Sequence, residues 1–81
     1  MYTILDSNNV SVYMYNDENA GAVEITAEDV KFHGDITDTL LNSSNCKLVN
    51  VGDTAPEDWI GRRYVYDNGV WSPNPNDPMK Q

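Results

Sequence analysis

Hydrophobic and polar residues alternate with a period of two near both ends of the chain, a pattern typical of β-strands. At the N-terminal end, residues 2–5 and 10–15 are rich in β-branched and aromatic side chains. Residues 6–9 between them, Asp-Ser-Asn-Asn, are turn formers. The pattern predicts a β-hairpin. Strict alternation along its second strand places the aliphatic residues toward the core and leaves Tyr13 and Tyr15 exposed.

The clearest local signal lies near the C-terminal end. Tyr64-Val65-Tyr66 and Val70-Trp71-Ser72 are separated by Asp67-Asn68-Gly69. Asn-Gly can adopt positive φ at both central positions of a two-residue hairpin turn. The sequence therefore predicts a tight hairpin in which Tyr66 faces Trp71, and such aromatic pairs stabilise a sheet by about 0.2–1 kcal/mol.

The middle of the chain gives weaker signals. Residues 16–21 predict a polar loop, residues 22–25 a short strand, and residues 46–51 a strand that ends at Gly52. Residues 26–33 leave two alternatives open. The capping-box spacing from Thr26 to Asp29 favours a short helix, whereas the alternation that follows favours a strand.

Two further short helices are expected. Ile36 and Leu40 are four residues apart, which would place them on one face of a helix over 35–41. Thr54 and Glu57 have capping-box spacing, and Gly61 would end the helical turn. Together these elements predict an α+β fold, a small and mainly antiparallel β domain with N-terminal and C-terminal hairpins and one or two short helices.

The length of 81 residues allows one hydrophobic core. We expect a single domain over residues 1–72, followed by an extended tail over 73–81 that contains Pro73, Pro75 and Pro78. The N-terminus has neither the basic nor the apolar region of a signal peptide, so we expect a cytoplasmic protein. The single cysteine, Cys46, excludes an internal disulfide.

The chain is strongly acidic, with 13 Asp and Glu against five Lys and Arg and a net charge of −8. Residues 1–45 hold eight of these acidic residues and one base, Lys31. This charge disfavours direct binding to nucleic acid or to an anionic membrane. An acidic half beside a nearly neutral aromatic half is compatible with head-to-tail self-association, with a basic partner, or simply with a solvated surface.

No catalytic pattern is complete in the sequence. His33 is the only histidine, and Ser43 and Ser44 lie in a polar Asn-Ser-Ser-Asn segment without the features of a nucleophile elbow. A lone cysteine at the start of an apolar strand, as at Cys46, is typical of an inert core residue. We therefore expect a protein that is not an enzyme, with no cofactor, no metal and no small-molecule substrate.

The remaining candidate is an aromatic surface near the C-terminal end. Tyr, Trp and Arg are enriched at the residues that dominate protein–protein binding. The candidate interface residues are Trp59, Arg62, Arg63, Tyr64, Tyr66 and Trp71. The alternative is that at least one of the two tryptophans belongs to the core of so small a domain.

The two ends of the chain also resemble small proteins of tailed bacteriophages. Such proteins often begin with a β-hairpin and end in a W-x-G … Y-x-(D/N)-G-x-W-x-P hairpin, as in tail-fibre-assembly-like and other small virion-associated chains. Here residues 1–10 form the opening run, and residues 51–61 and 66–75 form the closing run. The resemblance does not extend to the acidic middle of the chain, residues 16–45, and assigns no functional residue.

The resemblance implies a bacteriophage protein that is a minor virion component or helps one assemble. It would act through contacts with other virion proteins or with itself as a homo-oligomer, in the host cytoplasm during assembly and then in the virion. The alternative is an acidic inhibitor that mimics nucleic acid and binds a host nuclease or polymerase. In that case the residues imitating phosphates would be Asp17, Glu18, Glu24, Glu28, Asp29, Asp35 and Asp38.

Overall fold

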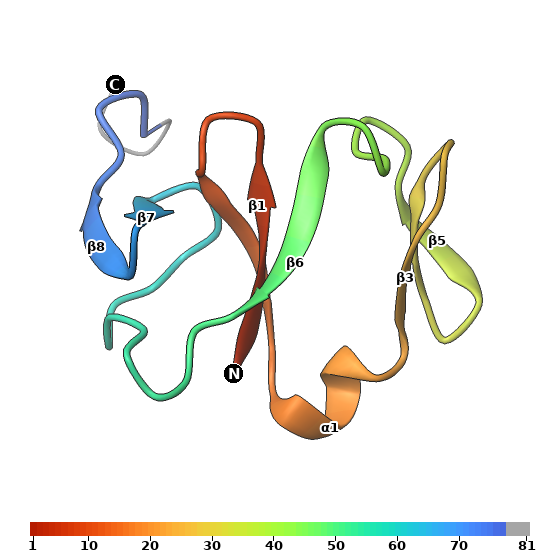
Figure 1. Ribbon diagram of the computed structural model, residues 1–81, viewed down its shortest axis with the longest axis horizontal. Helices are drawn as coiled ribbons and strands as arrows, with labels where there is room; N and C mark the ends of the chain where they lie inside the picture. Colours follow the sequence, from red (N-terminus) through yellow and green to blue (C-terminus); the bar gives the residue numbers. More distant parts are fainter. Residues whose placement is uncertain (78–81) are drawn as a thin grey trace.

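The computed structural model describes residues 1–77 and consists mostly of antiparallel strands (Figure 1). Its strands are β1 (Tyr2–Asp6), β2 (Ser11–Tyr15), β3 (Val23–Ile25), β4 (Val30–Phe32), β5 (Asp35–Asp38), β6 (Cys46–Asn50), β7 (Tyr64–Asp67) and β8 (Val70–Pro73). The sole helix within residues 1–77 is the single turn α1 (Asp17–Ala20). The expected antiparallel β domain is confirmed, whereas the α+β class with one or two short helices is not.

A central sheet of order β2-β1-β6 separates two smaller units. Figure 1 shows the sheet that contains β3 and β5 on one side of it and the β7-β8 hairpin on the other. On the side of the sheet that contains β3 and β5, apolar residues from the central sheet, from β4 and from the loop before β6 pack into one cluster. Its buried members are Ile4, Val12, Val30 and Leu41.

A register shift in the N-terminal hairpin changes which β2 side chains face this cluster. Ile4 pairs with Tyr13, but its neighbour Leu5 pairs with Ser11, so Val12 has no partner on β1. Such an extra residue interrupts the alternation of side chains along a strand. As a result, Tyr13 and Tyr15 pack against the same cluster as Val12 and are half-buried. The hairpin is confirmed, but the prediction of two exposed tyrosines is wrong.

The second sheet, of order β3-β4-β5, is built by two short antiparallel pairings. The alternative left open at residues 26–33 is decided in favour of a strand, because Val30–Phe32 forms β4. Thr26 still behaves as a cap, since its hydroxyl accepts hydrogen bonds from the amides of Glu28 and Asp29, but no helix follows. The Thr26–Asp29 spacing therefore stabilises the loop before β4 and does not start a helix.

The predicted helix over 35–41 is wrong. His33 and Gly34 both have positive φ, 51° and 82°, and form a tight turn that returns the chain along β4 as β5. Ile36 and Leu40 therefore do not share a buried helical face, and their side chains are 61% and 78% exposed.

The predicted helical turn after Thr54 is also absent. The Thr54 hydroxyl donates to the Val51 carbonyl and accepts from the Trp71 indole, so it is not available to cap a helix. A one-turn helix forms instead over residues 17–20, where a loop was expected. The Asn16 side chain accepts the Asn19 amide and caps it.

The C-terminal hairpin attaches to the free edge of β2. The Tyr66 amide donates to the Asn9 carbonyl, the Arg62 amide donates to the Ser11 carbonyl, and Val65 forms a bridge with Val10. Gly61 permits this close approach, because a Cβ atom there would lie 2.7 Å from the Val12 carbonyl oxygen. The two ends of the chain are thereby joined into one unit.

One side-chain hydrogen bond links the central sheet to β5. The Tyr13 hydroxyl donates to the Asp38 carboxylate over 2.8 Å. Burial, together with this bond, raises the pKa of Tyr13 to about 12. Burial alone would raise the pKa of Asp38, but hydrogen bonds from Tyr13 and from the Leu40 amide outweigh it and hold the pKa below its usual value.

These shifts predict a bell-shaped pH dependence for the stability difference between wild type and Tyr13→Phe. The Asp38 contribution is present above the unfolded pKa of about 3.9 and is lost as the pH falls through the lower folded value. The Tyr13 contribution is present below about pH 10 and is lost as the pH rises through its folded pKa. We expect a difference of about 1 kcal/mol at neutral pH, measured by urea unfolding from pH 3 to 11.5. A difference that does not change with pH would contradict a role for this bond.

Candidate functional site

The β7-β8 hairpin carries three aromatic rings side by side on one face. Its register is the predicted one, with Tyr66 opposite Trp71 and positive φ at Asn68 and Gly69. The Trp71 ring centroid lies 4.8 Å from that of Tyr66 and 6.3 Å from that of Tyr64. These separations are typical of favourable aromatic contacts. We call Tyr64, Tyr66 and Trp71 the aromatic ladder.

The polar atoms at two positions of the ladder are bound within the chain. The Trp71 indole nitrogen donates to the Thr54 hydroxyl over 2.9 Å. The Tyr64 hydroxyl donates to the Asp58 carboxylate. The bond from Tyr64 also lowers the pKa of Asp58, and the same bond raises the pKa of Tyr64. The rings of Tyr64 and Trp71 are thus held by residues that precede the hairpin in the sequence.

Trp59 lies elsewhere, against the N-terminal hairpin. Its indole nitrogen donates to the Ser11 hydroxyl over 2.9 Å, and Ser11 lies 2.6 Å from the Thr3 hydroxyl. Thr3 donates its proton to the Tyr13 carbonyl, so Ser11 must donate to Thr3. The donor and the acceptor of each of these hydrogen bonds are therefore determined. Because Thr3 and Ser11 are fully buried, Trp59 covers a polar part of the interior.

The two arginines of the candidate interface differ in their surroundings. Arg62 is exposed, with a positive φ of 72°. Arg63 is half-buried, and its guanidinium donates to the Asp58 carbonyl over 3.1 Å and lies 3.9 Å from the buried Asp77 carboxylate. Arg63 and Tyr64 therefore share Asp58 as a partner, and Arg63 lies beside the ladder.

The segment after β8 also contributes to this region. Asn74 is buried, and its amide and side-chain nitrogen donate to the carbonyls of Arg63 and Arg62. Residues 73–77 therefore pack back onto the domain and do not extend from it as expected. The rest of the predicted tail, residues 78–81, lies outside the described residues.

Structure thus brings together four of the six candidate residues, the ladder and Arg63. Sequence reasoning missed the residues that hold them, Thr54, Asp58 and Asn74. Their partners lie 5 to 17 positions away along the chain, and no local pattern indicates such pairings. The one available signal was the Asn-Pro-Asn-Asp composition around Asn74, which is typical of a turn.

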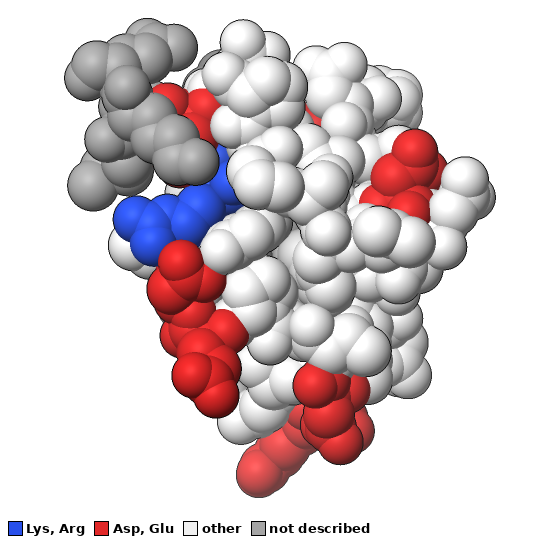
Figure 2. Space-filling view, turned by 90° about the vertical axis from the view of Figure 1, so that its left-hand side faces the viewer, with Lys and Arg blue, Asp and Glu red and all other residues white. Residues whose placement is uncertain are grey.

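The face that includes the β7-β8 side of the molecule has few charges at its centre. Figure 2 shows Lys and Arg in one place at its border, next to Asp and Glu, while the middle of the face is uncharged. Val70 of β8 is also apolar and 62% exposed, but strand alternation places its side chain on the hairpin face opposite Trp71. A poorly charged centre with charged residues around it is the usual arrangement of a protein–protein interface.

The acidic residues proposed as phosphate mimics are not all free to act as such. The N-terminal ammonium binds Asp17 over 2.6 Å, Thr26 donates to the buried Asp29, and Tyr13 donates to Asp38. The other four, Glu18, Glu24, Glu28 and Asp35, are exposed.

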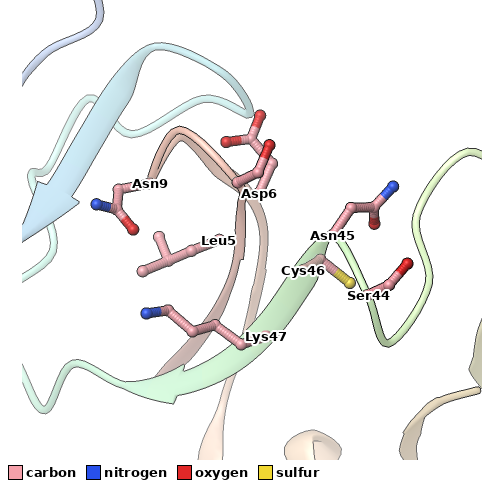
Figure 3. Close-up of a pocket in the computed structure, with 8 residues that line it drawn as sticks. Leu5, Asp6, Asn9, Ser44, Asn45, Cys46 and Lys47 are labelled. Atoms are coloured by element: carbon pink, nitrogen blue, oxygen red, sulfur yellow. The ribbon is translucent and has the colours of Figure 1, made fainter.

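A shallow hollow of about 220 Å³ lies between the β1-β2 turn and the start of β6. Figure 3 shows Lys47 and Cys46 pointing to opposite sides of β6 there. The Asp6 carboxylate accepts the amides of Asn8 and Val10, and the Cys46 thiol donates to the Asn42 carbonyl. Burial also raises the pKa of Cys46, so its reactive thiolate form is disfavoured. The hollow has no activated nucleophile.

Across residues 1–77, no three His, Cys, Asp or Glu side chains are grouped closely enough to hold a metal ion. The same part of the chain contains no helix long and apolar enough to cross a membrane. In comparisons with protein-family models, curated proteins and solved structures, nothing matched this chain.

Proposed function

We propose that this protein is a non-enzymatic assembly protein that binds other proteins through the aromatic ladder of its C-terminal hairpin. The observation that carries the proposal is the aromatic ladder, three adjacent rings on one hairpin face, two of which are fixed by side-chain hydrogen bonds. Rings that are already fixed lose little conformational entropy when a partner covers them. The ladder therefore offers apolar contact area at low entropic cost.

The setting that we propose is the virion of a tailed bacteriophage. Support for it is the resemblance of residues 1–10, 51–61 and 66–75 to small virion-associated proteins. The protein would act in several copies, in the host cytoplasm during assembly and afterwards in the particle. Its partners would be other copies of itself or neighbouring virion proteins.

The alternative of a nucleic-acid mimic has less support. Three of its seven acidic residues are engaged within the chain, as described above, which leaves fewer carboxylates to imitate a phosphate backbone. The two functions differ in their response to salt. Binding of a mimic to a basic host protein weakens steeply as ionic strength rises, whereas contacts between aromatic surfaces change little.

Light scattering of the purified protein at low and high salt tests the proposal. We expect a salt-resistant oligomer, and we expect Trp71→Ala to weaken association by about 30-fold, the effect of losing roughly 2 kcal/mol at a central aromatic contact. Tyr66→Ala is the companion variant, because the Tyr66 side chain forms no hydrogen bond with any other residue of the described part of the chain, 1–77. Val70→Ala is the matched control, since it removes an exposed apolar side chain from the opposite face of the same hairpin.

Three results would contradict the proposal. The first is that Trp71→Ala unfolds while Tyr66→Ala stays folded and associates normally, which would mean that the ladder is part of the core. Folded variants of both kinds with unchanged association would exclude the hairpin as the contact. The third is a wild-type monomer at both salts that also cross-links to no virion protein from position 66 in infected cells.

A further inference from the structure

The outer edge of β5 is open. Within residues 1–77, β5 pairs with β4 alone and is the last strand of its sheet. Figure 1 shows it at the opposite side of the molecule from β7 and β8. An open edge presents backbone N–H and C=O groups that can pair with another strand.

The turn before β5 determines which of its backbone groups point outward. In a two-residue hairpin, the residues flanking the turn exchange backbone hydrogen bonds, and the next pair does not. Here Phe32 and Asp35 flank the turn, and Lys31 and Ile36 form the next pair. The N–H and C=O of Ile36 therefore point away from β4, toward the open edge.

Two exposed apolar side chains lie in β5 and just after its end. Ile36 is 61% exposed and Leu40 is 78% exposed. Leu40 is held by two hydrogen bonds, from its amide to the Asp38 carboxylate and from the Asn45 side chain to its carbonyl. An exposed leucine on so constrained a segment adds apolar contact area beside the open strand.

The charge of this edge is negative. Asp35 and Asp38 are the first and last residues of β5, and Asp35 is exposed. Lys31, the one base among residues 1–45, lies directly opposite Glu24 on the neighbouring strand. A second copy of the chain is a poor occupant, because antiparallel pairing of two β5 strands would bring their aspartates together.

The edges of β8 and β6 are less suited to pairing. On β8, the position that would present an outward N–H two residues after Trp71 is Pro73, which has none. On β6, the side chains that are exposed are polar, at Lys47 and Asn50. Among these three edges, β5 alone combines an outward backbone pair with acidic ends and an exposed apolar residue between them.

We infer that the open edge of β5 is a second interaction site, which adds an extended, basic segment of a partner protein as a further antiparallel or parallel strand. Backbone pairing at Ile36 supplies affinity, and Asp35 selects a positively charged partner. The exposed Ile36 and Leu40 side chains contact apolar residues that alternate with the basic ones. The site does not depend on the aromatic ladder.

The probe for this site is the peptide acetyl-Lys-Val-Lys-Val-Lys-amide, titrated into ¹⁵N-labelled protein at low ionic strength. We expect saturable amide shifts at Ile36 and Thr37. The variant Ile36→Pro removes the outward N–H but none of the bonds between β4 and β5, so it should remain folded and bind about tenfold more weakly. Ile36→Ala keeps the N–H and separates the side-chain contribution from that of the backbone.

The charge and the location have their own controls. A peptide with Glu in place of Lys should not bind, and Asp35→Asn should weaken binding of the lysine peptide. Trp71→Ala should leave it unchanged, which separates this site from the hairpin surface. Equal binding of the two peptides, shifts confined to β6 or β8, or no shift at millimolar peptide would overturn the inference. Concentration-dependent shifts of β5 without peptide would show that the occupant is a second copy.

Discussion

Replacing Ile4 by alanine is expected to lower the free energy of unfolding by about 2–5 kcal/mol, the usual cost of emptying a fully buried site. Ile4 is 0% exposed and lies on β1, the middle strand of the central sheet. It contacts the apolar cluster that joins this sheet to β4, so the space left by its side chain has neighbours on all sides. A small single-core domain has little stability to spare, so the variant should be largely unfolded at 37 °C.

Ile36→Ala is the matched control. The substitution is chemically identical and also lies in a strand, but Ile36 is 61% exposed. Surface changes of this kind usually alter stability by less than about 0.5 kcal/mol. Urea unfolding followed by tryptophan fluorescence measures both variants. Similar losses in the two would mean that β5 is covered in solution or that Ile4 is not in the core.

Both hairpins were predictable from the sequence because their signals are local. The Asn68-Gly69 turn fixes the register of β7 and β8, and the turn formers at residues 6–9 separate β1 from β2. The turn at His33 and Gly34 has the same backbone conformation, but His-Gly is a weaker signal than Asn-Gly. The spacing of Ile36 and Leu40 then indicated a helix, although neither side chain is buried.

The faces of the N-terminal hairpin could not be predicted from alternation. One extra residue at Val12 moves Tyr13 and Tyr15 to the core side, while Ser11 turns to the opposite side and receives the Trp59 indole. A register shift depends on what packs against both faces of the strand, and here that includes a segment 48 residues away. No window of local sequence contains this information.

The candidate site shows the same division between local and distant causes. The pairing of Tyr66 and Trp71 follows from the turn between them and is confirmed. The positions of Trp59 and Arg63 depend on Ser11 and Asp77, which no spacing rule connects to them. The sequence therefore identifies residues of the types that are enriched at interfaces. Only the fold shows which of them lie at the surface and which cover the interior.

Gly61→Ala is expected to destabilise the protein by about 3 kcal/mol, at the upper end of the usual cost of overpacking. A Cβ atom at this position would lie 2.7 Å from the Val12 carbonyl oxygen, which belongs to the backbone of β2 and cannot rotate away. Relief requires the 61–63 segment to move from β2. That movement would break the bond from the Arg62 amide to the Ser11 carbonyl and loosen the contact between Trp59 and Ser11.

Gly21→Ala provides the comparison for this variant. Gly21 has helical φ and ψ of −66° and −18°, and a Cβ atom there would meet its nearest neighbour at an ordinary 3.7 Å. Alanine should be neutral or stabilise the protein by about 0.4–1 kcal/mol, because it restricts the unfolded chain.

Urea unfolding gives both values, and amide hydrogen exchange locates the effect. For Gly61→Ala, we expect faster exchange at Arg62 and Tyr66, whose amides bond to the β2 side, and little change in the β3-β4-β5 sheet. Equal stabilities for the two variants would mean that the C-terminal hairpin does not depend on close approach at Gly61, and another contact would have to hold it against the N-terminal hairpin.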